Sequence, residues 1–160
     1  MTIEIAKIKP EHDVAVAEVV RLVLTEYGAN KPGFAWDDPQ LDHLSKTYAD
    51  ENSQYLVVIQ DGVVMGGGGI GPLEGGDSHV CELQKMYFLP QIRGTGFGTA
   101  LLGTLLGFAR EQGYRHCYLE TLLSMSAANG LYNKTGFKVL DKPMGNTGHG
   151  SCDTWYLLVL

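Results

Sequence analysis

The sequence has few cysteines, few basic residues and no long apolar run, and each shortage excludes a class of protein. The three cysteines, Cys81, Cys117 and Cys152, show no CxxC spacing, which disfavours both a zinc site and a disulfide framework. We therefore expect reduced thiols and no bound metal. No apolar stretch reaches the ~18 residues of a membrane span, and residues 1–13 lack the pattern of a signal peptide. These absences predict a cytoplasmic protein that does not use a membrane as a partner.

Basic residues are outnumbered by acidic ones. The chain has 12 Lys and Arg against 18 Asp and Glu, a net charge of −6. Such a balance makes a general nucleic-acid partner unexpected and suits cationic or amine-bearing partners better. Glycine, in contrast, is abundant: 21 of 160 residues, nearly twice the usual share of about 7 %.

At 160 residues the length predicts one compact domain, residues 1–160. Apolar periodicity predicts a fold of the α/β class with a mixed sheet, because only the middle of the chain forms a βαβ unit. An Asp61-Gly62 pair predicts a hairpin turn, and Asp38 is expected to cap a second helix. The expected strands are 2–8, 54–60, 63–70, 78–89, 116–121, 137–140 and 153–160, and the expected helices are 11–27, 38–48, 96–112 and 126–135.

The most informative segment is ELQKMYFLPQIRGTGFGTALL, residues 82–102. Alternating glycines at the start of a helix let backbone N–H groups converge on a phosphate, and Arg93 adds a fork suited to phosphate oxygens. A Walker loop would need a lysine after Arg93, and the dinucleotide pattern GxGxxG fails at Thr99 and Leu101. A tight turn and helix cap without a ligand is the alternative. A second glycine run, 66–69, predicts a strand that lies close to a pocket or cofactor.

Two blocks carry a family resemblance. In the first, Gln91-x-x-Gly94-x-Gly96 and Arg93-x-x-Gly96-x-Gly98 follow a strand and a proline. In the second, residues 128–137 read ANGLYNKTGF. Together they resemble the GNAT superfamily of acetyl-CoA-dependent N-acetyltransferases, whose signatures are Gln/Arg-x-x-Gly-x-Gly/Ala and Ala-x-x-Leu-Tyr-x-x-x-Gly-Phe. Element order matches over essentially the whole chain. The resemblance implies about seven strands flanked by about four helices, with splayed central parallel strands.

The resemblance also implies roles for residues of these blocks. Backbone groups of Met86 and Phe88 would pair with the pantetheine arm of acetyl-CoA, the acyl donor, and Tyr132 would protonate the departing thiolate. Simple packing on the helix is the other interpretation of Tyr132. Family members often carry an asparagine where this chain has Met125. The pyrophosphate would be held by the amides of Arg93, Gly94, Thr95, Gly96, Phe97, Gly98 and Thr99.

The acceptor amine must lose a proton to attack the thioester. Strand alternation places Glu82, Met86 and Phe88 on one face and favours Glu82 as the base. Glu120 is its competitor, at the end of the neighbouring strand. His79 is a third choice, on the opposite face near the strand start. The other interpretation of either carboxylate is a structural one, in which it binds a backbone amide or a basic side chain.

The acceptor pocket is expected near Tyr27, Phe34 and Trp36, with Asp37 and Asp38 supplying negative charge. A hydrophobic lid is the other interpretation of Trp36. The predicted function is transfer of the acetyl group to an amine of a small molecule or peptide, by direct attack in a ternary complex, and a homodimer is the expected assembly. The alternatives are a catalytically inactive acetyl-CoA sensor of the same fold and a module that binds ATP or NAD.

Overall fold

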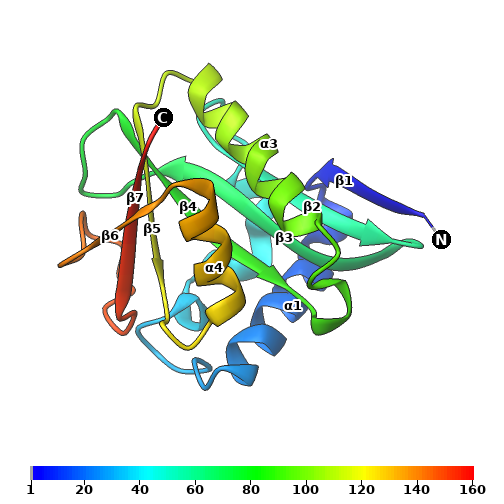
Figure 1. Ribbon diagram of the computed structural model, residues 1–160. Helices are drawn as coiled ribbons and strands as arrows, with labels where there is room; N and C mark the ends of the chain where they lie inside the picture. Colours follow the sequence, from blue (N-terminus) through cyan, green and yellow to red (C-terminus); the bar gives the residue numbers. More distant parts are fainter. Residues whose placement is uncertain (1) are drawn as a thin grey trace.

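In the computed structural model, which describes residues 2–160, seven strands form one mixed sheet with helices on both faces (Figure 1). The strand order is β1-β2-β3-β4-β5-β7-β6. The strands are β1 (Ile3–Lys7), β2 (Gln54–Gln60), β3 (Val63–Pro72), β4 (Val80–Phe88), β5 (His116–Thr121), β6 (Lys138–Leu140) and β7 (Thr154–Val159). The helices are α1 (Asp13–Glu26), α2 (Leu44–Thr47), α3 (Phe97–Glu111) and α4 (Ser126–Thr135). The predicted fold class is confirmed.

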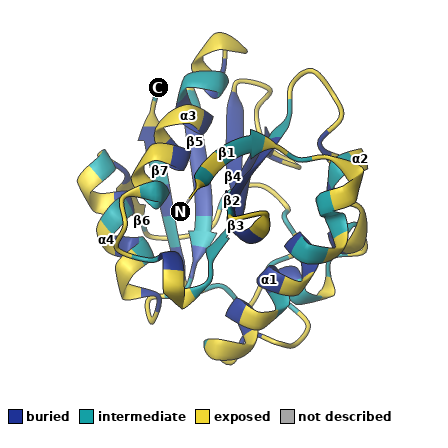
Figure 2. Cartoon of the chain, turned by 90° about the vertical axis from the view of Figure 1, so that its right-hand side faces the viewer, coloured by how far each residue is buried: buried dark blue, intermediate teal, exposed yellow. Residues whose placement is uncertain are grey.

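The two faces of the sheet carry separate hydrophobic cores. Figure 2 shows α3 and α4 on one side of the sheet and α1 and α2 on the other. Leu101 and Leu105 of α3 belong to the first core, and Val16, Val20 and Leu24 of α1 belong to the second. Each helix presents these residues at a spacing of four, so one stripe of it is buried. Among residues 2–160, no helix is long and apolar enough to cross a membrane.

The centre of the sheet opens between its two parallel neighbours, β4 and β5. They pair only over three positions, Val80–Glu82 with His116–Tyr118. Beyond these positions the two strands do not pair with each other, although β4 stays paired with β3 to Phe88 and β5 with β7 to Thr121. The strands therefore splay, as predicted, and their C-terminal ends diverge (Figure 1).

A bulge in β4 changes which face its side chains occupy. The β3–β4 register shifts between Gly67 and Gly69, and Lys85 has a positive φ of 49°. One extra residue at a bulge reverses the alternation of a strand. Met86 and Phe88 thus lie on the α3–α4 face, whereas Glu82 lies on the opposite face. The predicted common face for these three residues is wrong for that reason.

The predicted helix 38–48 is also mostly wrong. The chain instead makes 3₁₀ turns at Ala35–Asp37 and Leu41–His43, then the single-turn α2. Asp38 is extended, with φ −67° and ψ 124°, because a residue before proline is kept out of the helical region. Its carboxylate, free of any capping role, is available for contacts across the molecule.

The four glycines 66–69 of β3 make room for side chains of the protein itself. A Cβ at Gly67 would lie 2.7 Å from both a Tyr55 ring carbon and the Leu56 carbonyl oxygen, and one at Gly69 would lie 2.7 Å from the Tyr55 ring. Tyr55 packs flat on the bare strand, and its hydroxyl donates a 2.8 Å hydrogen bond to the Lys85 carbonyl. The glycine run therefore supports the bulge in β4.

Candidate active site

Three adjoining pockets lead from the glycine loop, through the gap between β4 and β5, to the loop 141–153. The glycine-loop pocket, about 270 Å³, shares Met86, Tyr87, Met125 and Ala128 with a narrow strand-gap pocket of about 40 Å³. The strand-gap pocket in turn shares Glu120 and Cys152 with a pocket of about 340 Å³ beneath the loop, here called the loop pocket. Because the first and third pockets share no lining residue, they communicate only through the gap.

The glycine-loop pocket has the features of an anion site. Gly94 and Gly96 have positive φ values of 72° and 89°, and no protein atom lies within 4 Å of the position that a Cβ would take at either. Helix α3 starts directly after Gly96, so the N–H groups of its first turn have no intrahelical partners. Open space beside a helix N-terminus is where a phosphate fits best. The residues present thus fit the diphosphate of acetyl-CoA.

The Arg93 side chain, however, is engaged elsewhere. Its two terminal nitrogens each donate a 2.8 Å hydrogen bond to Glu26 of α1, and its Nε donates to the Phe88 carbonyl at 3.0 Å. The guanidinium also lies over the Tyr27 ring. Arg93 therefore joins α1 to the end of β4, and the attraction for an anion at this loop comes chiefly from backbone amides.

Tyr132 of α4 lines the strand-gap pocket. Its ring packs between Phe137 and Tyr156, at centroid distances of 5.7 Å to each. Within residues 2–160 its hydroxyl has no hydrogen-bond partner, although the residue is only 5 % exposed. Burial raises the pKa of this phenol well above its usual value. Tyr132 therefore presents a protonated, unengaged hydroxyl to the gap.

Asn129, one turn earlier on α4, has a structural role. Its amide nitrogen donates to the carbonyls of Leu122 and Met125, and its oxygen accepts a 2.8 Å hydrogen bond from the Tyr156 hydroxyl. These bonds fix the turn that joins β5 to α4. Asn129 is therefore occupied with backbone, while Met125 lines both the glycine-loop and strand-gap pockets.

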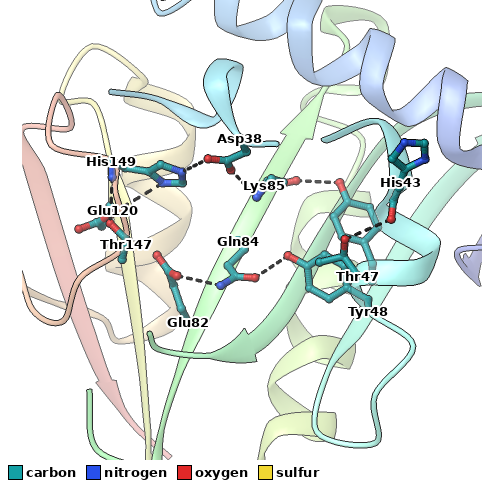
Figure 3. Close-up of polar contacts among 11 residues, drawn as sticks. Asp38, His43, Thr47, Tyr48, Glu82, Gln84, Lys85, Glu120, Thr147 and His149 are labelled. Carbon is teal, nitrogen blue, oxygen red and sulfur yellow. Dashed lines mark hydrogen bonds and ion pairs between the residues drawn. The ribbon is translucent and has the colours of Figure 1, made fainter. Parts of the chain in front are cut away.

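On the other face of the sheet a buried polar cluster surrounds the end of the gap (Figure 3). Asp38 lies between two cationic groups, 2.6 Å from Lys85 Nζ and 2.8 Å from His149 Nε2. Burial would raise the pKa of Asp38, but the hydrogen bond from His149 and the charge of Lys85 outweigh it and lower the pKa. Glu120 accepts hydrogen bonds from the Tyr118 and Thr147 hydroxyls, and its Oε1 lies 3.9 Å from His149 Nδ1.

Glu82 lies beside this cluster and is the more basic carboxylate. The pKa of Glu82 is raised to about 7. Burial is the main cause and the negative charge of Glu120 adds to it, while a hydrogen bond from Gln84 acts in the opposite direction. Gln84 donates to Glu82 at 2.8 Å and in turn accepts from the Tyr48 hydroxyl. Glu82 lines none of the three pockets, whereas Glu120 lines two of them.

The residues predicted from sequence divide among these places. Phe34 lines the strand-gap pocket, Tyr27 lies on the glycine-loop pocket rather than beside the carboxylates, and Trp36 packs in the core against α1. The side chain of Thr95 closes the preceding turn on the Ile92 carbonyl, and Phe97 packs on the core under α3. The predicted residues that line the glycine-loop pocket are Met86, Phe88, Arg93, Gly94, Gly96, Gly98 and Thr99.

Sequence reasoning missed Lys85, His149 and Trp155. Lys85 was hidden because alternation without a bulge aims it away from the site. His149 lies in the glycine-rich stretch 145–150, and a lone histidine in such a loop carries no pattern. One indirect signal was available. The loop 141–153 leads into β7, which pairs with β5 and places Trp155 opposite Glu120, so this loop must pass close to Glu120.

Comparison with known proteins gives consistent matches. Residues 17–137 match the model of the acetyltransferase (GNAT) family. Uncharacterized N-acetyltransferase YjgM of Escherichia coli (strain K12) is 47 % identical over 141 residues, which are 87 % of this chain and 84 % of that protein. Human N-acetyltransferase 8B is 31 % identical over 122 residues, 74 % of this chain but only 51 % of the human protein, so the chain spans about half of that relative.

Solved structures share the fold at low sequence identity. An acetyltransferase of the GNAT family from Staphylococcus aureus Mu50 superimposes with a TM-score of 0.85 at 21 % identity, covering 98 % of both chains. The yncA protein of Salmonella typhimurium, in a structure with its cofactor acetyl-CoA, gives a TM-score of 0.76 at 21 % identity over 99 % of this chain and 94 % of that one.

Proposed function

Because the chain belongs to the GNAT family of acetyltransferases, we propose that it transfers the acetyl group of acetyl-CoA directly to an amine of a small molecule or peptide, within a ternary complex. Family membership makes the protein an acetyl-CoA-dependent N-acetyltransferase. The nature of the acceptor, the direct route of transfer and the action of residues 1–160 as one domain are parts of the proposal. The observation that carries it is the continuous path from the glycine loop, past the Tyr132 hydroxyl, to Glu120.

On the donor side, the first turn of α3 and the loop 93–99 hold the diphosphate through backbone amides. The edge of β4 that faces β5, at Met86 and Phe88, binds the pantetheine arm as an added strand would, since β5 has already diverged from it. This arrangement brings the thioester to the strand-gap pocket. There the Tyr132 hydroxyl donates a hydrogen bond to the sulfur as the C–S bond breaks and passes it a proton, which water then returns to the phenolate.

On the acceptor side, the two carboxylates have different tasks. Glu120 lines the path and binds the amine, and hydrogen bonds from the Tyr118 and Thr147 hydroxyls hold its carboxylate in place. Glu82 accepts the proton, through water if needed, because a base with a pKa of about 7 matches neutral conditions. Burial keeps the pKa of Glu82 raised, and the negative charge of Glu120 adds to this effect.

Direct transfer is favoured over an acetyl-cysteine intermediate. Cys152 is the one cysteine among residues 2–160 that lines the strand-gap pocket. Burial raises the pKa of its thiol to about 12, and the neighbouring carboxylates add to the effect. Since the thiolate is the nucleophile, Cys152 is held in its unreactive form.

Calorimetry and a turnover assay test the proposal. We expect acetyl-CoA to bind and ATP and NAD not to bind, and a panel of amines to contain acceptors that release free thiol. Tyr132→Phe should retain the fold and the acetyl-CoA affinity but lower kcat by about 100-fold, because the hydroxyl has no structural partner. Binding of acetyl-CoA without any turnover would identify a sensor of the same fold instead, and binding of ATP alone would reject the whole assignment.

A further inference from the structure

The loop pocket contains a pair of hydrogen-bond acceptors that face each other. His149 Nε2 lies 2.8 Å from Asp38, whose carboxylate also pairs with Lys85 and therefore accepts this hydrogen bond. The neutral ring therefore keeps its proton on Nε2 and leaves Nδ1 with a bare lone pair. That lone pair lies 3.9 Å from Glu120 Oε1. Two acceptors at this separation can both be reached by one nitrogen at hydrogen-bond distance, about 2.9 Å from each.

The aromatic side chain of Trp155 lies beside the Glu120 carboxylate. Trp155 of β7 is the direct cross-strand partner of Glu120 in the antiparallel β5–β7 pair, so their side chains are neighbours on one face of the sheet. Trp155 lines the loop pocket together with Pro143 and Met144. A carboxylate next to an indole face is a combination that attracts an ammonium group on a flat or apolar body.

We propose that Glu120, His149 and Trp155 form the acceptor-binding site, and that it takes a small primary amine with an aromatic or similarly flat apolar body. The proposal rests on the acetyl-transfer function above and names its substrate class. A neutral primary amine has two N–H donors, one for Glu120 Oε1 and one for His149 Nδ1, which leaves its lone pair free for the thioester. A secondary amine has a single N–H and cannot satisfy both acceptors while it attacks.

His149 then makes acceptor binding depend on pH. Four groups face its ring: Asp38 from the loop 28–40, Lys85 and Glu82 from β4, and Glu120 from β5. Burial disfavours the charged ring, but the hydrogen bond and charge of Asp38 outweigh it and raise the pKa of His149. When protonated, the ring donates to Glu120 and repels an ammonium. The KM for the amine should therefore fall as pH rises through the His149 titration.

Two substitutions at His149 separate its two contacts. In His149→Gln the amide nitrogen can still reach Asp38, so the link between the loops is kept while the acceptor beside Glu120 is lost. In His149→Asn the carbonyl replaces Nδ1, so the acceptor is kept while the Asp38 contact is lost. With saturating acetyl-CoA and benzylamine as the probe, we expect His149→Gln to raise the KM at least tenfold, with a smaller change in kcat.

His149→Asn should stay within a few-fold of the wild-type KM, and both variants should lose the part of the pH dependence of KM that follows the His149 titration, while the part due to ionisation of benzylamine remains. N-methylbenzylamine should be a far poorer acceptor than benzylamine for the wild type. Trp155→Ala should raise the KM for benzylamine, and Trp155→Phe should largely restore it. The Kd for acetyl-CoA, measured for each variant, should remain unchanged, and thermal unfolding should show that each variant is folded at the assay temperature.

Equal KM values and pH profiles for wild type and His149→Gln would overturn the proposal, as would equal use of the two amines. A wild type that acetylates other amines but not benzylamine would overturn this site while leaving acetyl transfer intact. Absence of thiol release with every amine, or of acetyl-CoA binding, would instead reject the proposed function itself, and the acceptor site with it.

Discussion

Replacing one glycine of β3 should destabilise the protein far more than the same change in a helix. A Cβ at Gly67 would lie 2.7 Å from the Leu56 carbonyl oxygen, which belongs to the neighbouring strand, and 2.7 Å from the Tyr55 ring. Neither can move without disturbing the sheet or breaking the 2.8 Å hydrogen bond from Tyr55 to the Lys85 carbonyl. Overpacking and loss of that bond together predict a cost of about 3 kcal/mol for Gly67→Ala.

Urea and thermal unfolding measure this cost, which corresponds to a fall in Tm of roughly 6–12 °C for a chain of this size. Gly103→Ala is the matched control, because Gly103 lies in α3 with open space around it and alanine should stabilise the helix by about 0.5–1 kcal/mol. Gly68→Ala should fall between the two, since its Cβ meets the flexible Met86 side chain at 2.8 Å. A Gly67→Ala protein as stable as the wild type would refute the account of the glycine run.

Three further outcomes are expected. Gly96→Val should weaken acetyl-CoA binding at least tenfold by calorimetry, whereas Gly113→Val, with a similar φ (87° against 89°) and similar open space but far from the loop, should leave the Kd unchanged. Glu82→Gln should remove the fall in kcat/KM below about pH 7, because protonation of a base with that pKa is what stops catalysis in acid; an unaltered profile would contradict its role. Cys152→Ala should retain kcat within a few-fold, and mass spectrometry of the wild type mixed with acetyl-CoA alone should show no acetylated enzyme.

The order of elements follows from the sequence because each depends on local signals. The Asp61-Gly62 turn has positive φ at both residues, 49° and 82°, as the two-residue hairpin requires. Strand β5 and helix α4 begin and end where their apolar spacing places them. The mixed sheet and the splay follow from the single βαβ unit together with the family resemblance, so these features needed little information from distant contacts.

The composition of the candidate site depends on distant contacts, which is why sequence reasoning found only part of it. The bulge at Lys85 arises because bare glycines of β3 admit Tyr55 beneath it, a three-strand arrangement that no single strand pattern reveals. Arg93 is paired with Glu26, 67 positions earlier. Asp38 and His149 meet across 111 positions, and because no α-helix starts at Asp38, its carboxylate is free for that contact.

The separation of the glycine-loop pocket from the loop pocket has a consequence for the order of events during turnover. In the proposed arrangement acetyl-CoA occupies the glycine-loop pocket and the amine occupies the loop pocket, and these two pockets share no lining residue. Neither substrate would then block the entry or exit of the other. Initial-velocity and product-inhibition patterns should accordingly be those of random addition, with free CoA competitive against acetyl-CoA and non-competitive against the amine.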